Sequence, residues 1–368
     1  MKTLIVTNYY LPGIKGGGPV NSIKNIVDSV NGNFDILTKS KDVGEKNKYK
    51  KVKLNNWNKV NKSRVFYLDN LAILRINKIL KMGDYDIIYL NSVFATLSIY
   101  IYFLTIFRDT KVVIAPRGEL NINALNIKKY KKFFFMSFLK IYSKINNVKF
   151  HATSNAEKKD IQMFFKNDIQ VISNLPSEHF EKNRKNSKEV NKLKIMCVAR
   201  INKMKNIHYA IDRINEVKNG EITFDIYGAF EDINYKKYCE SISLNDHVSV
   251  NFIGNTTKDV LKLKYQDYDL FFLPTLGENF GHSIIEAIQN HMPVLISDNT
   301  PWKNLYAKNV GFEYALDDKS SFVKCLNMLL SYSNEDYENM FLGFERFITT
   351  ELNTEENINR YYELLLKN

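Results

Sequence analysis

Two series of apolar, strand-like runs that alternate with helical patterns constrain the fold of this chain most. The first series comprises Thr3–Thr7, Phe34–Thr38, Asp86–Leu90, Lys111–Ala115, and the weaker runs Phe150–Ser154 and Gln170–Ile172. The second comprises Lys194–Val198, Thr223–Tyr227, Val248–Ile253, Leu270–Leu273 and Val294–Ser297. Between strands, apolar residues recur at helical spacing, as in 21–30. Such alternation predicts an α/β fold with two Rossmann-like parallel-sheet domains.

The polar stretch Ser177–Lys192 separates the two series and is the predicted linker. We therefore expect an N-terminal domain over 1–176 and a C-terminal domain over 177–352. A chain of 368 residues with 45% hydrophobic content can build two cores. Ligands of parallel sheets bind at the carboxyl ends of the strands. The sequence thus predicts an active site in a central cleft that the two domains face.

Charge is distributed unevenly between the two halves. Residues 1–185 contain 32 Lys and Arg against 14 Asp and Glu, whereas the remainder has 20 against 26. The basic half suits a polyanionic partner such as a membrane surface, a lipid pyrophosphate or nucleic acid. Within it, 128–149 has Phe134, Phe138, Ile141 and Ile145 at helical spacing among lysines. This pattern fits a helix in a membrane interface and, equally, a helix that packs on the core with a basic outer face.

Several classes of protein are disfavoured by the sequence. The three cysteines, Cys197, Cys239 and Cys325, are far apart and lack zinc-site spacing, so we expect reduced, buried thiols. The apolar stretch Val93–Phe107 has about 15 residues, short of the roughly 20 that span a bilayer. The N-terminal run is read as a strand because no cleavage site follows it. These features predict a cytoplasmic protein without a membrane span.

The segment 274–296, PTLGENFGHSIIEAIQNHMPVLI, carries the most informative motif. Glu278 and Glu286 are separated by seven residues and bracket a glycine-containing loop that leads into a helix. Such a loop and the helix dipole favour a ligand phosphate. Taken alone, the segment is equally consistent with an ordinary strand–loop–helix that has solvated carboxylates.

This segment resembles the retaining glycosyltransferases of family 4, which have the GT-B fold. The resemblance lies in GENFG, in the spacing of the two glutamates and in EA followed by MPV, with His291 where the family usually has glycine. A second match is Arg200 followed by Lys205-Asn206. A third is the glycine run at 16–18 after the first strand, which also suits a flexible loop.

The resemblance implies a role for each matched position. Arg200 and Lys205 would hold the donor diphosphate, with Glu278 near the sugar. The expected donor-binding residues are Gly17, Gly18, Asn279, Phe280, Gly281 and Glu286, the last on the ribose. Arg117 and Glu119 stand where many members place a histidine, near the acceptor or the transferred sugar; His151 is a less suitable substitute. The helix at about 353–368 is expected to pack back on the first domain.

Two Asp-x-Asp triplets, at 84–86 and 267–269, match the metal-binding pattern of other glycosyltransferases. Each precedes an apolar strand, a place where Asp is common in turns. We read both as helix-to-strand turns and expect no essential metal and no cofactor.

The predicted function is that of a retaining hexosyltransferase. It would move a hexose or N-acetylhexosamine from a UDP- or GDP-sugar to a glycan or a polyprenyl-pyrophosphate-linked acceptor, in capsule or O-antigen-type polysaccharide biosynthesis. Peripheral contact with the anionic inner face of the cell membrane is expected, and a nucleic-acid partner is not. Two alternatives stay open: a basic lipid- or RNA-binding protein on a transferase-like scaffold, and a sugar-nucleotide epimerase of the same fold.

Overall fold

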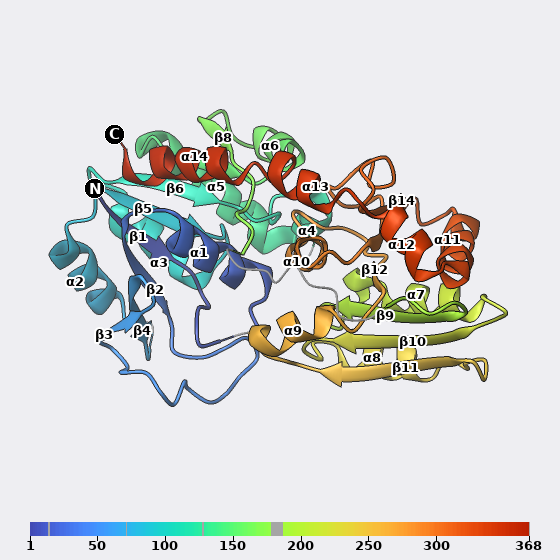
Figure 1. Ribbon diagram of the computed structural model, residues 1–368. Coiled ribbons are helices and arrows are strands. Elements are labelled where there is room, and N and C mark those ends of the chain that lie inside the picture. The colour runs from blue at the N-terminus through green and yellow to red at the C-terminus, as the bar shows by residue number, and fades with distance from the viewer. Residues whose placement is uncertain (14, 71, 127–128, 178–186, 368) are drawn as a thin grey trace. The chain divides into compact units, whose positions relative to one another are not determined.

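The computed structural model describes residues 1–13, 15–70, 72–126, 129–177 and 187–367. It divides into two compact units, one formed by Met1–Leu175 with Thr354–Asn368 and the other by Pro176–Asn353 (Figure 1). Each unit has a largely parallel sheet with helices packed against it. The predicted α/β class with two Rossmann-like sheets is therefore confirmed.

The first unit contains an eight-stranded sheet in the order β3-β4-β2-β1-β5-β6-β7-β8. Its strands are β1 Lys2–Val6, β2 Asn33–Lys39, β3 Trp57–Val60, β4 Ser63–Leu68, β5 Ile87–Asn91, β6 Lys111–Ala115, β7 Lys149–Ala152 and β8 Ile169–Val171. Its helices are α1 Gly18–Ser29, α2 Ile73–Gly83, α3 Thr96–Thr105, α4 Ile122–Asn126, α5 Lys129–Ile145, α6 Asn155–Gln162 and α14 Thr354–Leu366. The edge strand β3 is antiparallel to β4, and neither strand was predicted from the sequence.

Side chains alternate between the two faces of this sheet, and helices cover both. In β1, Leu4 and Val6 join a core that includes Leu97 of α3 and Leu139 of α5. Ile5, between them, joins a second core that is formed with α1 and α14. Strands buried on both faces are expected to be continuously apolar, which explains runs such as IIYL in β5.

The helix α14 belongs to the first unit although 176–353 lie between it and the rest of that unit. Its Tyr361 and Leu365 are fully buried. The hydroxyl of Thr3 in β1 donates a hydrogen bond to the carbonyl of Leu365. Helix and sheet are thus joined by both apolar and polar contacts.

The second unit contains a six-stranded parallel sheet in the order β11-β10-β9-β12-β13-β14. Its strands are β9 Lys192–Val198, β10 Glu221–Tyr227, β11 Val248–Gly254, β12 Leu270–Leu273, β13 Val294–Ser297 and β14 Gly311–Tyr314. Its helices are α7 Ile207–Asn215, α8 Ile233–Glu240, α9 Lys258–Tyr265, α10 His282–Gln289, α11 Lys319–Ser331, α12 Asn334–Met340 and α13 Phe344–Thr350, with a 3-10 turn, η1, at Lys203–Lys205. The three cysteines are reduced and buried in this unit.

The end of the predicted linker is part of the second unit. Lys188 is buried, and its ammonium group donates to the carbonyl of Lys192, 2.7 Å away, where β9 begins. Residues 178–186 of the predicted linker lie outside the described residues.

Strand order reverses once in each sheet. The chain builds outward from β1 through β2 and then returns to add β5 on the other side of β1. In the second unit it builds from β9 through β10 and returns to add β12 beside β9. In open α/β sheets, ligands bind outside the carboxyl ends of strands at such reversals. The loops after β1, β5, β9 and β12 are therefore the places to look for functional residues.

The described part of the chain has no helix with the length and apolar content that crossing a membrane requires. The apolar stretch 93–107 contains α3, which covers only Thr96–Thr105.

Candidate active site

Lys205 and Glu278 meet at the strand reversal of the second unit. Lys205 ends the short turn η1 after β9, and Glu278 follows β12. The ammonium group of Lys205 forms an ion pair with the Glu278 carboxylate, although 73 residues separate them in sequence. Their side chains are 15% and 16% exposed, so the pair is largely shielded but reachable from solvent. A fixed cation at this edge can stabilise a ligand phosphate.

Hydrogen bonds fasten the two loops that carry this pair. Asn202 caps η1, with its side-chain oxygen accepting from the backbone N–H of Lys205 at 3.3 Å. The amide group of Asn206 donates to the carbonyl of Pro274 at 3.0 Å. In return, Leu276 N–H donates to the carbonyl of Met204 at 2.8 Å. Hydrogen bonds in both directions therefore hold the loop that carries Lys205 against the loop that carries Glu278.

Arg200 lies at the start of the same loop but has a different partner. Its guanidinium donates to Glu231 Oε1 at 2.9 Å, and both side chains are well exposed. Glu231 follows β10, one strand farther from the reversal. Sequence reasoning missed Glu231, because an acidic residue in a polar loop carries no signal until the strand order is known.

The glycine-containing loop after β12 leads directly into α10. Gly281 is the N-cap of α10 and has φ 75°, in the left-handed region that favours glycine. A Cβ on Gly281 would lie 2.7 Å from Ile284 Cδ1, so the Ile284 side chain would also have to shift. The first-turn amides of α10 point back toward this loop, which makes it an anion-binding position.

The side chain of Phe280 is buried in the core of the second unit. Its ring packs edge-on against Trp302 with centroids 5.3 Å apart, and the indole N–H donates to the Phe280 carbonyl. Phe280 and its neighbour Asn279 can therefore offer backbone groups to a ligand while the Phe280 side chain anchors the loop.

Glu286 lies on α10 and is half-buried. The pKa of Tyr265 is raised mainly because its own hydroxyl is buried, and the charge of Glu286 raises it further. Burial raises the pKa of Cys197 to about 12, and the same thiol senses the opposing charges of Lys205 and Glu278. Cys197 also contributes to the raised pKa of Tyr265. The two glutamates therefore belong to one neighbourhood around the ends of β9 and β12.

In the first unit, the glycine run follows β1 at the strand reversal. Gly17 has φ 60° and is the N-cap of α1, which begins at Gly18 with Pro19 in its first turn. Proline suits this position because its missing N–H has no helical partner there. The structure thus places Gly17 and Gly18 at a helix N-terminus on the carboxyl edge of the sheet.

Arg117 and Glu119 follow β6 and are held by polar contacts. Arg117 donates to Asn91 Oδ1 at 2.7 Å, Asn174 Oδ1 at 2.6 Å and the Tyr89 hydroxyl at 2.8 Å. Its φ of 57° is unusual for a residue with a side chain, and such strain often marks functional loops.

Glu119 braces the loop after β5. It accepts from the Ser92 hydroxyl at 2.7 Å and from the backbone N–H groups of Val93 and Phe94 at 2.7 and 3.1 Å. Burial raises its pKa, and these hydrogen bonds oppose the shift. Arg117 and Glu119 therefore shape this edge of the sheet as a pair of loop anchors.

His151 lies in β7 and is fully buried, and the Tyr89 hydroxyl links it to Arg117. Its Nδ1 accepts from the Tyr89 hydroxyl at 2.7 Å, and its Nε2 faces the carbonyl of Ile172 at 2.9 Å and the Tyr361 hydroxyl at 3.3 Å. Since a carbonyl can only accept, Nε2 carries the proton. Burial, followed by the charge of Arg117, lowers the pKa of His151 to about 3. This position does not suit direct contact with a sugar.

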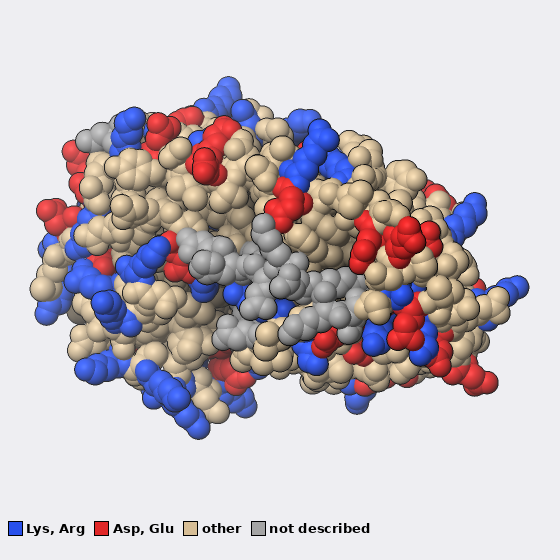
Figure 2. Space-filling view, in the orientation of Figure 1, with Lys and Arg blue, Asp and Glu red and all other residues tan. Residues whose placement is uncertain are grey.

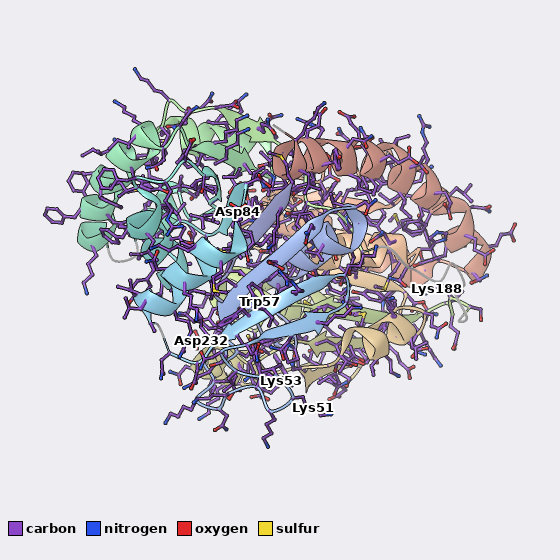
Figure 3. All side chains as sticks on the ribbon, turned by 90° about the vertical axis from the view of Figure 1, so that its left-hand side faces the viewer. Lys51, Lys53, Trp57, Asp84, Lys188 and Asp232 are labelled. Carbon is purple, nitrogen blue, oxygen red and sulfur yellow. The ribbon has the colours of Figure 1, made fainter. Side chains whose placement is uncertain are left out.

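Each Asp-x-Asp triplet lies at the amino end of a strand, opposite the carboxyl edge of its own sheet. Asp84, which is labelled in Figure 3, is the C-cap of α2 with φ 46°. Asp86 accepts from the N–H of Lys2 at 2.7 Å. Asp269 is buried and accepts from the N–H of Lys194 at 2.9 Å. Within the described ranges, no group of three or more His, Cys, Asp or Glu side chains has a metal-binding arrangement.

His291 occupies a position whose backbone conformation favours glycine. Its φ is 54°, a conformation that costs a side-chain-bearing residue free energy. The imidazole stacks on Phe344 with centroids 5.2 Å apart and lies 3.2 Å from Glu345 Oε1. The contacts of the His291 side chain with Phe344 and Glu345 offset part of the conformational free energy that its positive φ costs.

Known proteins resemble the chain in sequence and in fold. Residues 178–340 match the family model described as glycosyl transferases group 1. An uncharacterized 41.2 kDa protein in the cps region of Klebsiella pneumoniae is 25% identical over 237 residues, which cover 61% of this chain and 63% of the relative.

Several solved structures superpose over nearly the whole chain. The crystal structure of WaaG, a glycosyltransferase involved in lipopolysaccharide biosynthesis, matches with TM-score 0.68 and 13% identity over 100% of both chains. Sucrose-phosphate synthase from Thermosynechococcus elongatus matches with TM-score 0.75 and 12% identity, covering 99% of this chain and 98% of its own. HepE of Anabaena, in complex with UDP and glucose, matches with TM-score 0.70 and 15% identity over 99% of both chains.

The sheet orders, the helical layers and these superpositions agree. The protein has the GT-B fold, and residues 178–340, the larger part of the second unit, match the model of glycosyl transferases group 1.

Proposed function

We propose that this protein is a retaining glycosyltransferase of family 4 that transfers a hexose or N-acetylhexosamine from a UDP- or GDP-sugar. The acceptor is a glycan or a polyprenyl-pyrophosphate-linked glycan, in the assembly of a capsule or O-antigen-type polysaccharide. The second unit binds the donor and the first unit binds the acceptor. The enzyme works in the cytoplasm, in peripheral contact with the anionic inner face of the membrane.

The Lys205–Glu278 pair is the observation that carries this proposal. It places a shielded cation and a carboxylate at the strand reversal of the second sheet, beside the N-terminus of α10. A sugar diphosphate needs both features: positive charge for its phosphates and a hydrogen-bond acceptor for its hydroxyls. The group 1 domain, the UDP-bound state of HepE and the cps-region relative support the same class of donor and product.

Catalysis follows from where negative charge develops. When the glycosidic bond to the donor breaks, the departing nucleoside diphosphate gains charge, and Lys205 and Arg200 stabilise it. Both cations are held by carboxylates in the structure, Lys205 by Glu278 and Arg200 by Glu231. The arriving diphosphate replaces these carboxylates as partner, so the cations are already positioned near the leaving group.

The other residues orient the substrates. Glu278 accepts hydrogen bonds from the sugar, Glu286 from the ribose, and the backbone of 279–281 donates to the diphosphate. A donor phosphate oxygen takes the proton of the acceptor hydroxyl, so no side-chain base and no metal ion is needed. In the first unit, Gly17 and Gly18 admit a phosphate to the N-terminus of α1, and Arg117 and Glu119 shape the acceptor side.

A nucleotide panel tests the donor assignment. A UDP- or GDP-sugar at one hundred times its Kd stabilises the native state by about 2.7 kcal/mol, which raises Tm by about 5 to 10 °C for a unit of this size. Failure of every UDP-, GDP- and ADP-sugar to raise Tm would refute the donor site and favour a binding protein.

Kinetics test the role of Lys205. With the best donor, Lys205→Ala should lower kcat/KM by about a hundred- to a thousand-fold. Lys264→Ala is a matched control, because Lys264 pairs with Asp267 at 3.2 Å at the opposite edge of the same sheet. Equal activity of the two variants would contradict the assignment. Product NMR then reports whether the anomeric configuration is retained, and activity in EDTA tests the expected independence from metal.

A further inference from the structure

The helices α3 and α5 of the first unit expose an apolar surface. They pack together through Tyr102 and Tyr142, whose ring centroids are 4.9 Å apart, and through a 2.6 Å hydrogen bond between Thr105 and Tyr142. The core-facing side of α5 consists of buried residues such as Met136 and Leu139. On the outer side, more apolar residues are exposed. We define the α3–α5 surface as Phe103, Phe107, Phe133, Phe134, Phe138, Ile141 and Ile145.

Most side chains of this surface are more than half exposed, and they lie next to one another. Phe107 is 91% exposed and Phe134 is 76% exposed, and the remaining members except the half-buried Phe138 are more than half exposed. Phe138 stacks on Phe103 with centroids 5.0 Å apart, which joins the two helices on the outside. Along α5, Phe134, Phe138, Ile141 and Ile145 fall within an arc of about 60°. Contiguous exposed apolar patches of this kind mark interaction sites on soluble proteins.

Charged residues on α5 and in its flanking segments are all positive. Residues 120–156 contain seven Lys and neither Asp nor Glu. Lys140 and Lys144 are exposed on α5, and their helical positions border the apolar arc on one side. Lys and Arg side chains are also frequent over α2 and β2 to β4 of the first unit on the face in Figure 2. An apolar stripe flanked by lysines is the pattern of helices that lie in the headgroup region of anionic membranes.

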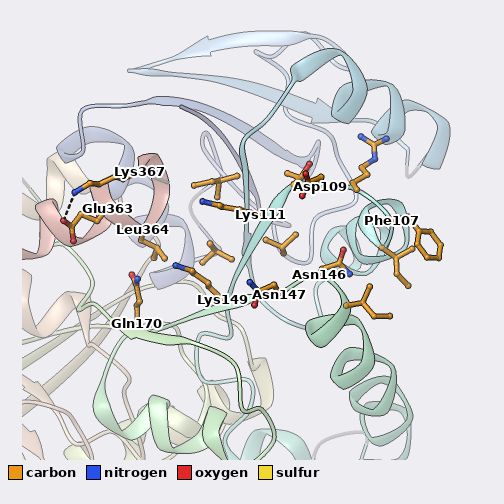
Figure 4. Close-up of a pocket in the computed structure, with 17 residues that line it drawn as sticks. Phe107, Asp109, Lys111, Asn146, Asn147, Lys149, Gln170, Glu363, Leu364 and Lys367 are labelled. Carbon is orange, nitrogen blue, oxygen red and sulfur yellow. Dashed lines mark ion pairs between the residues drawn. The ribbon is translucent and has the colours of Figure 1, made fainter.

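A hollow adjoins the surface at the amino ends of β5 and β6. It has a volume of about 830 Å³, and Phe107 and Ile145 contribute to its lining (Figure 4). Four cationic side chains line it against two carboxylates; these are Arg108, Lys111, Lys149 and Lys367, with Asp109 and Glu363.

Because the cationic side chains that line the hollow outnumber the carboxylates, its lining carries a net positive charge. Lys367 lies 3.5 Å from Glu363, and Lys149 lies 3.6 Å from Asp168, outside the hollow. Figure 4 shows Lys111 and Lys149 on neighbouring strands within the hollow, and Phe107 pointing outward at its margin. A phosphate-bearing headgroup fits this combination, because its acyl chains would extend along the adjacent apolar residues.

We propose that the α3–α5 surface docks on an anionic phospholipid bilayer. Its phenylalanine and isoleucine side chains enter the boundary between headgroups and acyl chains, Lys140 and Lys144 contact the phosphates, and the hollow receives one headgroup. This inference deepens the membrane contact of the proposed function by assigning the surface, and it is independent of the catalytic assignment.

Vesicle co-sedimentation tests the docking surface. The full chain should bind vesicles of equimolar phosphatidylcholine and phosphatidylglycerol and bind pure phosphatidylcholine at least ten-fold more weakly. Phe134→Ser with Ile141→Ser should lower binding at least ten-fold. Lys140→Gln with Lys144→Gln should lower it about thirty-fold, from the typical contribution of a basic residue near an anionic surface.

Matched controls come from elsewhere in the first unit. Leu74→Ser with Met82→Ser removes two exposed apolar residues of α2, and Lys51→Gln with Lys53→Gln removes two exposed cations before β3 (Figure 3). Neither control should weaken binding more than two-fold. Controls that weaken binding as much as the test variants would overturn the docking surface, as would test variants that bind like wild type.

Two further measurements separate the possible failures. The first is the oligomeric state. If wild type forms a dimer and binds no vesicles, and the variant with Phe134→Ser and Ile141→Ser is a monomer, then a second copy of the chain covers the surface and the proposal is overturned. The Tm increase with the best nucleotide sugar should be the same in all these variants. A donor site that fails in wild type while vesicles still bind refutes the catalytic proposal and leaves the docking surface standing.

Discussion

The buried His151 should make the first unit sensitive to acid. Its imidazole is neutral in the folded state, because burial lowers its pKa from the ordinary 6.5 to about 3. In the unfolded chain the imidazole binds a proton near pH 6.5. Between these pH values the unfolded state therefore binds more protons than the folded one, and stability is lost as pH falls through this window. From pH 7.5 to pH 5.0 the loss from this one group is about 2 kcal/mol.

The assay compares wild type with His151→Gln at both pH values. The chain has two tryptophans, Trp57 in β3 of the first unit and Trp302 in the second. In a Trp302→Phe background, the fluorescence of Trp57 (Figure 3) reports urea unfolding of the first unit alone. The change in the free energy of unfolding between pH 7.5 and pH 5.0 is measured for each protein. The variant lacks the hydrogen bonds of His151 at both pH values, so their loss cancels when the change in the variant is subtracted from the change in wild type.

Wild type should lose about 2 kcal/mol more than His151→Gln on going to pH 5.0. The carboxylates of the first unit titrate in both proteins and cancel in the same way. A double difference below about 0.5 kcal/mol would refute the reasoning, and so would an imidazole NMR signal that titrates near pH 6.5. Either result would mean that His151 is reached by water and does not support Tyr89 and Arg117 as described.

Three further predictions concern the loops and α14. Glu231→Gln should lower the donor KM about three-fold, because a negative charge beside Arg200 is removed, and stability should change by less than about 0.5 kcal/mol; a raised KM in steady-state kinetics would contradict this. Gly281→Ala should cost about 1–2 kcal/mol in the thermal unfolding of the second unit, whereas Gly277→Ala, whose added Cβ meets open space, should be nearly neutral; equal losses would refute the conformational argument. Tyr361→Phe should destabilise the first unit by about 1 kcal/mol, measured through Trp57, since the hydroxyl beside His151 is lost; an unchanged urea midpoint would show that this hydroxyl contributes nothing.

Much of the fold was predictable from the sequence because buried parallel strands are short, continuous apolar runs. β1, β2, β5 and β6 were predicted within two residues of their observed ends, as were five strands of the second unit. β3 and β4 were missed: they form a hairpin closed at Asn61-Lys62, with Asn61 at φ 49°, and this pair is a weaker turn signal than Asn-Gly. β14 was missed because it has only four residues, among them Gly311 and the charged Glu313, and so short a run carries little periodicity.

The candidate site was less accessible from the sequence. The motif positions identified Lys205 and Glu278 separately, but their ion pair depends on β12 returning to the side of β9. The partner of Arg200 was not predictable, because any of several loop acids could have served. For α5, periodicity identified the apolar stripe but not its direction, since Met136, Leu139 and Tyr142 supply a second apolar face that is the buried one.

The place of α14 has a consequence for biosynthesis. The second unit is one continuous segment, 176–353, so it can complete its core as soon as that segment has left the ribosome. The first unit must wait for 354–366, although most of it is synthesised earlier. Until then, the apolar groove around Ile5 and Tyr89 lacks its cover. A nascent chain therefore exposes its earliest-made unit longest, and a stop codon near residue 353 would damage the half of the protein encoded farthest upstream.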